Sequence, residues 1–203
     1  MANPTGIQRR NGSLRSGVAS TVKAPVALAL YLSLLPALAP PAPAQVTGIS
    51  RFAVIDPGLA RGARPSADAI LGLAHHGYRT VVSFVHDPSE GSRVRAAGMR
   101  YVEIPMSATL FGASVPTDQD LERFFRVVLD STARPVYMHC VHGKDRTGAM
   151  AAIYRIEVSE WTAGQAIAEM DRMGFNGMYH NLHRFVQSYA SRGYGAKRLP
   201  PAD

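Results

Sequence analysis

One short segment constrains the fold more than any other: a loop between a strand pattern and a helix pattern. Residues 139–148 have the sequence HCVHGKDRTG and follow an apolar run from Pro135 to Met138. Apolar residues then recur at helical spacing, at positions 149, 152, 153 and 156. The pattern predicts a buried strand, a turn and a helix whose N-terminus offers free N–H groups and a positive dipole end. Such a junction suits a bound phosphate or oxyanion.

The residue types in this loop indicate a nucleophile and a phosphate-binding cation. Cys140 begins the loop and Arg146 ends it, with five residues between them. A thiol in the field of a helix N-terminus and a cation has a lowered pKa, which makes it a nucleophile at neutral pH. A planar guanidinium can bind two phosphate oxygens at once. Gly143 and Gly148 allow the backbone to turn tightly and to approach a ligand closely.

The order Cys-x5-Arg-Thr-Gly, preceded by His139 and an apolar strand, resembles the signature of the cysteine-dependent protein tyrosine and dual-specificity phosphatases. Residues 61–66 (RGARPS) also resemble an early turn of the bacterial and plant–fungal atypical dual-specificity phosphatases. The resemblance covers about residues 50–192. It implies a phosphatase-like α/β fold, in which a mostly parallel central sheet is flanked by helices on both faces and carries the Cys-x5-Arg phosphate loop.

The resemblance also implies roles within the loop. Cys140 is the expected nucleophile and forms a cysteinyl-phosphate that water hydrolyses, while Arg146 and backbone N–H groups hold the phosphate oxygens. Thr147 is expected to steady the thiolate through its hydroxyl, and His139 to support the loop by hydrogen bonds. No metal and no other cofactor is expected. The expected substrate-binding residues are Val141, His142, Gly143, Lys144, Asp145, Arg146 and Thr147.

The leaving group needs a proton, so a general acid is expected as well. Most members of the family carry an aspartate on the mobile segment before the cysteine strand, but residues 105–117 (PMSATLFGASVPT) contain no Asp or Glu. Asp145 lies beside Arg146 inside the loop, an order that resembles the myotubularin and Sac-type phosphoinositide phosphatases. We therefore favour Asp145 as the third catalytic residue. Asp118 and Asp120, at the start of the next helix, remain as alternatives.

The remaining sequence predicts strands that alternate with helices. The run from Thr80 to Val85 is apolar and β-prone, which is typical of a buried parallel strand. Ser66, Thr117 and Thr162 are expected helix caps, the last two within capping boxes. The alternation independently predicts a mostly parallel sheet, whose ligands bind at the carboxyl ends of the strands. We expect strands near residues 52–55, 80–85, 100–104 and 135–139, and helices from Ser66 to Gly77, over 90–97, after Thr117, after the loop, after Thr162 and over 182–189.

The N-terminal residues have the composition of an export signal. Four basic residues precede an apolar core from about Val26 to Leu38, and Ala42-Pro43-Ala44 offers a cleavage site. We therefore expect residues 1–44 to be a signal peptide and residues 45–203 to be the catalytic domain, located in the periplasm or secreted after cleavage. A retained membrane anchor is the alternative, and no other contact with a membrane is expected.

The composition argues against two classes of function, arsenate reduction and nucleic-acid binding. Cys140 is the only cysteine, so no disulfide forms within the chain. Arsenate reductases with a similar loop need further cysteines, which makes that class a weaker alternative. The formal net charge of +7 includes the four basic residues of the N-terminal segment and shows no clustering elsewhere, so no nucleic-acid partner is expected.

The expected function is hydrolysis of phosphate monoesters on proteins that carry phosphotyrosine, phosphoserine or phosphothreonine. The loop residues His142, Lys144 and Asp145 leave inositol phosphates or phosphoinositides as alternative substrates. The expected partner is therefore a phosphorylated protein or a small-molecule or lipid phosphate. A non-catalytic phosphate-binding module and a rhodanese-like sulfurtransferase are the rival classes, and residues 146–148 (RTG) disfavour the second.

Overall fold

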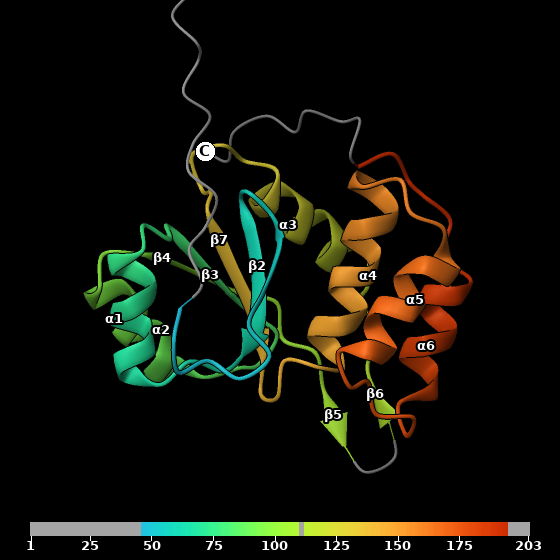
Figure 1. The fold of residues 1–203 in the computed structure, drawn as a ribbon, viewed down its shortest axis with the longest axis horizontal. Helices are drawn as coiled ribbons and strands as arrows, with labels where there is room; N and C mark the ends of the chain where they lie inside the picture. Colours follow the sequence, from blue (N-terminus) through green and yellow to red (C-terminus); the bar gives the residue numbers. More distant parts are fainter. Residues whose placement is uncertain (1–45, 110–111, 195–203) are drawn as a thin grey trace, which may run out of the picture. The chain divides into compact units, whose positions relative to one another are not determined.

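The computed structural model describes residues 46–109 and 112–194, all within the unit Pro40–Asp203. The signal peptide expected at residues 1–44 lies outside the described residues. In the five-stranded sheet, β1 (Ala53–Asp56) pairs antiparallel with β2 (Leu59–Ala63) and the other three neighbouring pairs are parallel, which confirms the mostly parallel sheet. The order across the five-stranded sheet is β1 (Ala53–Asp56), β2 (Leu59–Ala63), β7 (Val136–Cys140), β3 (Thr80–Ser83) and β4 (Arg100–Glu103) (Figure 1).

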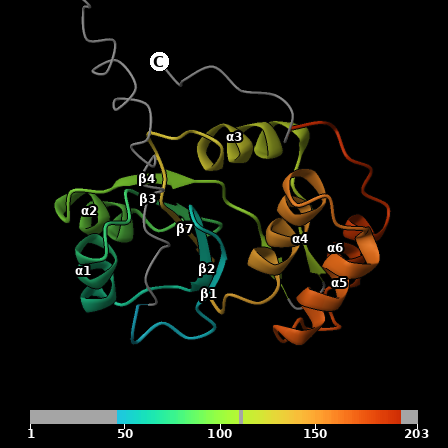
Figure 2. The ribbon, with the colours of Figure 1, turned by 45° about the horizontal axis from the view of Figure 1, so that its top comes forward.

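Helices cover both faces of this sheet, as the sequence predicted (Figure 1, Figure 2). The hydrophobic core has two parts, one on each face of the sheet, because successive side chains along a strand point to opposite faces. Val81 and Tyr137 pack with one group of helices, whereas Val82 and Met138 pack with the other. The first group is α1 (Ala67–His75) and α2 (Pro88–Ala96), and the second is α3 (Asp118–Val128), α4 (Arg146–Val158), α5 (Ala163–Arg172) and α6 (His180–Gln187).

Most helix starts follow from local sequence. The Ser66 hydroxyl accepts a hydrogen bond from the third residue of its helix, and the expected capping boxes at Thr117 and Thr162 are both present. α2 begins two residues earlier than expected. Asp87 caps it by accepting two backbone N–H bonds, and Pro88 occupies the first helical position, where its missing N–H is no loss.

The turn expected at residues 61–66 is wrong for the first three of them, which belong to a strand. Residues 59–63 (LARGA) form β2, which is buried at all five positions between β1 and β7. The stretch has no β-branched residue, so its local propensity is weak and pairing with two neighbours determines the strand. Gly62 has no room for a side chain, because a Cβ there would lie 2.4 Å from the Tyr137 hydroxyl.

The segment before α3 contains a short hairpin. β5 (Ala108–Thr109) and β6 (Gly112–Ala113) form a short antiparallel hairpin, which lies beside α6 in Figure 1. Asn181 of α6 donates a hydrogen bond to the Ala113 carbonyl, which ties the hairpin to that helix. Among the helices of the described residues, none has the length and apolarity to cross a membrane.

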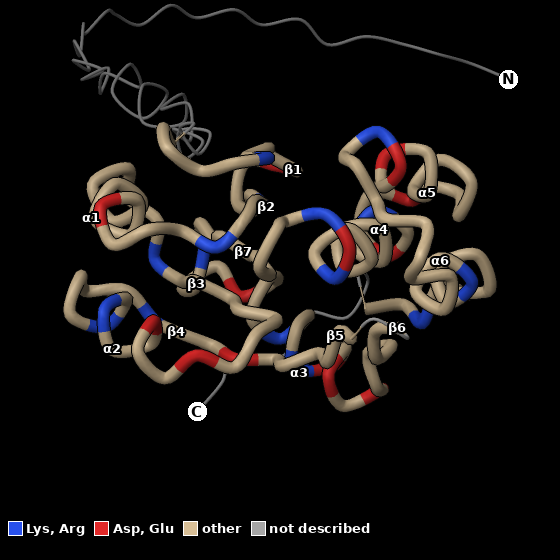
Figure 3. Tube along the Cα trace, turned by 90° about the horizontal axis from the view of Figure 1, so that it is seen from below, with Lys and Arg blue, Asp and Glu red and all other residues tan. Residues whose placement is uncertain are grey.

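The parallel register brings the carboxyl ends of four strands to one edge of the sheet. Cys140 lies opposite Ala63, and Ser83 lies opposite both His139 and Glu103. The loops that follow β2, β3, β4 and β7 therefore meet at this edge, where ligands bind in sheets of this type. Figure 3 shows the chain from below, with its basic and acidic positions coloured.

Candidate active site

The predicted phosphate loop lies between the end of β7 at Cys140 and the start of α4 at Arg146. Asp145 occupies the N-cap position of α4, but its side chain makes no capping hydrogen bond. The first N–H groups of α4 are therefore not used by the cap and point toward the loop. A strand end, a tight turn and an uncapped helix N-terminus together form a cradle suited to an oxyanion.

Gly143 fixes the turn in the middle of this loop. Its φ of 73° lies in the left-handed region, and a Cβ would lie 2.3–2.5 Å from backbone atoms of Gly62 and Ala63. The loop thus packs directly on the backbone of β2. Arg61 of the same strand donates from Nη2 to the Gly143 carbonyl at 2.9 Å and holds the turn from beneath.

Arg61 supports the phosphate loop, a contact that was not expected from the sequence. Its side chain is 1% exposed, and its Nε and Nη1 have no hydrogen-bonding partner in the described part of the chain. Burial lowers the pKa of the guanidinium, while the charges of Glu169 and Cys140 act in the opposite direction. The sequence contained one signal for Arg61, because it is the only charged residue in the otherwise apolar segment 59–63 (LARGA).

Cys140 has the properties expected of a nucleophile. The residue is 2% exposed, and this burial by itself raises the pKa of the thiol. Hydrogen bonds from the Thr147 hydroxyl and N–H, the charge of Arg146 and the Gly143 N–H outweigh burial, so the pKa lies below its ordinary value. The buried Thr147 hydroxyl has no other hydrogen-bonding partner among the described residues.

Arg146 is held at the opening of the loop by the ends of two other strands. Its Nη1 donates to the carbonyl of Phe84, after β3, at 3.3 Å and to that of Met106, after β4, at 2.8 Å. The guanidinium is half-buried and has five donors in a planar fork. Two carbonyls thus orient this fork, which retains donors for phosphate oxygens.

Asp145 is built into the same loop. The residue is 7% exposed, and its Oδ1 accepts a hydrogen bond of 2.7 Å from the backbone N–H of Asn176, in the connection between α5 and α6. This bond fixes one carboxylate oxygen and ties the loop to the helical layer.

The two alternative aspartates are engaged elsewhere. Asp118 has an 84% exposed side chain and pairs with Arg192. Asp120 closes the capping box by accepting from the N–H and hydroxyl of Thr117 at 2.9 and 2.7 Å. Within the described residues, no hydrogen bond connects either carboxylate to positions 139–148.

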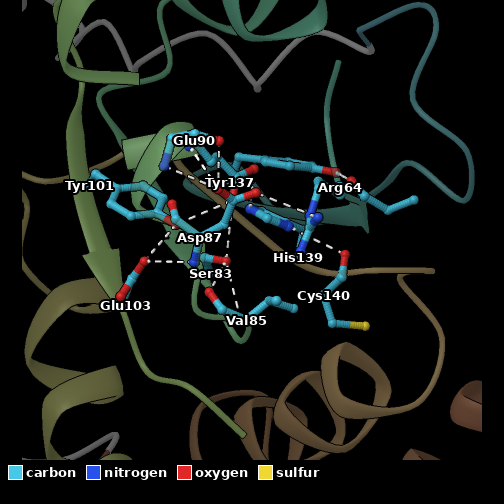
Figure 4. A network of polar contacts seen from close by, with 12 residues as sticks. Arg64, Ser83, Val85, Asp87, Glu90, Tyr101, Glu103, Tyr137, His139 and Cys140 are labelled. Carbon is cyan, nitrogen blue, oxygen red and sulfur yellow. Dashed lines mark hydrogen bonds and ion pairs between the residues drawn. The ribbon is translucent and has the colours of Figure 1, made fainter. Parts of the chain in front are cut away.

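His139 supports the loop from behind. Its Nδ1 lies 3.3 Å from the Cys140 carbonyl oxygen, and its Nε2 lies 3.2 Å from Oε1 of Glu90 in the first turn of α2. Figure 4 shows Glu90, His139 and Cys140 within one network of polar contacts. His139 was expected from the sequence, whereas Glu90 was not, because its position at a helix start is typical of a solvated residue.

Basic residues surround the outer side of the loop. Val141 and His142 are exposed and Lys144 is half-buried. Arg51 donates from Nη1 to the His142 carbonyl at 3.2 Å, and the backbone N–H of Arg64 donates to the Val141 carbonyl at 3.2 Å. The described residues contain no group of His, Cys, Asp or Glu placed to hold a metal ion.

Comparison with known proteins identifies relatives of this site and fold. A family described as "DSP-PTPase phosphatase fused to NAD+ Kinase" matches residues 50–188. The dual specificity protein phosphatase TpbA of Pseudomonas aeruginosa (strain UCBPP-PA14) is 36% identical over 121 residues, which are 60% of this chain and 53% of that protein. The chain therefore spans about half the length of the curated relatives it matches.

Solved structures show the same fold. A crystal structure of a variant of P. aeruginosa TpbA in complex with pTyr has a TM-score of 0.59 and 28% identity, and covers 72% of this chain and 88% of that chain. The core catalytic domain of the PP-IP phosphatase SIW14 from S. cerevisiae, in complex with citrate, has a TM-score of 0.63. It is 18% identical and covers 75% of this chain and 93% of that chain, so the likeness concerns the fold alone.

Proposed function

The chain belongs to the DSP-PTPase family of cysteine-dependent phosphatase domains, and from this premise we propose that it hydrolyses phosphate monoesters through a cysteinyl-phosphate intermediate. The observation that carries the proposal is Cys140 itself. Its thiol has a lowered pKa and begins a loop that ends at Arg146 and the N-terminus of α4. A nucleophile, a fixed cation and a set of N–H groups are the parts that phosphoryl transfer requires.

In the first step the Cys140 thiolate attacks phosphorus. An S–P bond forms while the bond between phosphorus and the leaving oxygen breaks. Arg146 and the loop N–H groups stabilise the charge that spreads over the three equatorial oxygens. In the second step water attacks phosphorus, the S–P bond breaks, and inorganic phosphate leaves together with the regenerated thiolate.

Asp145 is the proposed source of the proton for the leaving oxygen. One of its oxygens is bonded to the Asn176 N–H, and the other remains for proton transfer. In the second step the same carboxylate takes a proton from the attacking water. The pairing of Asp118 with Arg192 and the capping role of Asp120 at the start of its own helix support this choice over the two alternatives.

The proposed substrates are proteins that carry phosphotyrosine, phosphoserine or phosphothreonine. The dual-specificity class of the relative and the pTyr bound to its variant support this class of substrate. A second candidate is an inositol phosphate or a phosphoinositide, because Arg51 and Lys144 lie around the outer side of the loop, in addition to Arg146 at its end. Several cations near one phosphate site favour a substrate with more than one phosphate.

We further propose that the mature protein is periplasmic or secreted. The basic residues, the apolar core and the Ala-Pro-Ala sequence before Gln45 support a cleaved signal peptide.

The deciding experiment is a substrate panel with the wild-type chain and Cys140→Ser. The panel contains phosphopeptides, inositol phosphates and phosphoinositides, with nitrophenyl phosphate as a generic substrate and thiosulfate for the sulfurtransferase alternative. We expect phosphate release from phosphopeptides by the wild type only. Turnover of thiosulfate, or of no phosphate ester, would contradict the proposal. Phosphate binding without turnover would instead identify a non-catalytic phosphate-binding module.

A further inference from the structure

β4 lies at the edge of the sheet, and a groove follows its open side. Two cavities of about 480 and 430 Å³ lie along this side, and they share Tyr101 of β4 and Arg123 of α3. The larger cavity is bounded by β4 and α3, and the smaller one also reaches α2. Figure 2 and Figure 3 show β4 between α2 and α3. Because the two cavities share lining residues, they form one groove, which we call the β4 groove.

The backbone of β4 offers hydrogen bonds to this groove. The N–H groups of Arg100 and Ile104 donate to carbonyls of β3 and of the residue before it, at 2.8 and 2.9 Å. Successive N–H groups of a strand point to opposite sides, so those of Tyr101 and Glu103 point away from β3. In the described part of the chain, no strand pairs with β4 on that side. An open edge of this kind is a template for the addition of another strand.

The side chains around the β4 groove are mainly cationic. Four exposed arginines line it, from α2, β4 and α3: Arg95, Arg100, Arg123 and Arg126. The carboxylates that line it among the described residues are those of Glu103 and Glu122. The arginines come from three separate elements, so the fold gathers them. Their excess over the carboxylates favours an acidic ligand.

Both carboxylates of the groove already have partners. Glu103 lies 2.8 Å from Nδ1 of His86 and accepts from the Asp87 N–H at 3.1 Å. Glu122 pairs with Arg126, one helical turn further along α3, at 3.0 Å. The charges of Glu103 and Glu122 are thus directed to these partners, and the other arginines of the groove remain for a ligand.

Two of the arginines have no carboxylate partner among the described residues. Arg100 lies 3.8 Å from Asp130, whereas neither Arg95 nor Arg123 takes part in an ion pair there. The Arg95 guanidinium lies over the ring of Tyr101, 5.5 Å from its centroid, beside the open edge of β4. Arg95 and Arg123 both line the smaller cavity. The least compensated positive charge therefore lies on the two sides of the strand edge.

We propose that the β4 groove binds an extended, acidic segment of the phosphorylated protein substrate, which adds to β4 as a further strand. Main-chain hydrogen bonds with Tyr101 and Glu103 hold the segment, while Arg95 and Arg123 bind its carboxylate side chains. The inference rests on the proposed function in taking a phosphoprotein as the substrate.

The direction of β4 connects this groove with the phosphate loop. The strand ends at Glu103, which pairs with Ser83 at the carboxyl edge of the sheet, where the loops of the active site meet. The chain continues from there to Met106, whose carbonyl accepts from Arg146 at 2.8 Å. A segment that follows β4 to its end therefore leads toward the active site.

The first test measures binding without turnover. The probe is an unphosphorylated, fluorescent peptide of alternating Val and Glu residues, and anisotropy reports its affinity. We expect the wild-type chain to bind this peptide, and to bind neither a Val–Lys peptide nor the Val–Glu peptide with every amide N-methylated. Absence of binding to the Val–Glu peptide would overturn the inference. Equal binding of the Val–Lys or the methylated peptide would overturn it as well, because charge or strand pairing would then play no part.

Two variants and a control locate the bound peptide. Arg95→Ala and Arg123→Ala should each weaken Val–Glu binding by about two- to fivefold, as expected for exposed charge pairs. Arg172→Ala, at an exposed position in the last turn of α5, should bind like the wild type. Hydrogen exchange at the amides of Tyr101 and Glu103 should slow when the peptide is added. Unchanged affinity in both groove variants, or unchanged exchange at these amides, would contradict the inference.

The second test uses turnover of phosphotyrosine peptides that carry either a Val–Glu or a Val–Lys segment. We expect the KM of the wild type to be at least about threefold lower for the acidic peptide, and the two KM values to converge in Arg123→Ala. Equal KM values in the wild type would overturn the inference and leave the proposed function intact. If no phosphate ester were hydrolysed, the proposed function would fail, while peptide binding and hydrogen exchange would still decide whether the groove binds an acidic strand.

Discussion

Replacement of Gly143 by alanine tests the contact that holds the phosphate loop on β2. A Cβ at this position would lie 2.3 and 2.4 Å from the carbonyl carbon and oxygen of Gly62 and 2.5 Å from the nitrogen of Ala63. All three are backbone atoms, so no side-chain rotation relieves the overlap. The left-handed conformation costs roughly 1–2 kcal/mol for a non-glycine residue, and overpacking about 1–3 kcal/mol. The free energy of unfolding should therefore fall by roughly 2–5 kcal/mol.

Denaturant and thermal unfolding measure this loss. For a chain of this size, 1 kcal/mol corresponds to a Tm change of about 2–4 °C, so the Tm of Gly143→Ala should fall by roughly 4–20 °C. Gly77→Ala is the matched control, because Gly77 has a φ of 80° and no atom lies within 4 Å of the place that its Cβ would take. The control should lose only the free energy that the left-handed conformation costs. The difference in unfolding free energy between the two variants therefore measures the overlap with β2.

Phosphate binding and turnover complete the test. The loop could instead shift away from β2 and relieve the overlap. The loss of unfolding free energy would then be smaller, but phosphate affinity and kcat/KM would fall because the loop N–H groups are displaced. Equal unfolding free energies for the two variants, together with wild-type phosphate affinity and kcat/KM in Gly143→Ala, would refute the reasoning.

Four further predictions concern the chemistry and the N-terminus. Cys140→Ser and Arg146→Ala should each abolish turnover, and Cys140→Ser should still bind phosphate in calorimetry, because the backbone cradle remains; near-wild-type kcat in Cys140→Ser would exclude the covalent mechanism. Asp145→Asn should slow alkyl phosphates by roughly 10²–10⁴-fold and nitrophenyl phosphate far less, whereas a selective defect in Asp118→Asn would move the acid to α3. Because the pKa of Cys140 is lowered in the folded chain, the thiolate contributes stability above the pKa of the unfolded thiol, and this is lost as pH falls through the folded pKa. Unfolding of Cys140→Ser should lack that pH dependence, and an identical pH–stability curve would contradict it. Mass spectrometry of the exported protein should find Gln45 at the N-terminus, and an intact N-terminal segment in the membrane fraction would indicate an anchor instead.

The sequence by itself determined the phosphate loop and most of the elements around it. The residues from Cys140 to Arg146 lie within one turn, so their spacing already implied a shared cradle at a helix N-terminus. The capping boxes at Thr117 and Thr162 were equally predictable, because a cap forms between residues three positions apart. In both cases the contacts that matter are local in sequence.

Only the tertiary structure decided what lies beneath and behind that loop. β2 has weak strand propensity and exists because β1 and β7 pair with it on both sides, which in turn brings Arg61 under Gly143. Glu90 reaches His139 across 49 positions of the chain because α2 packs on the face of the sheet that carries Tyr137. Contacts between residues so distant in sequence depend on strand order and register, and no local pattern encodes strand order or register.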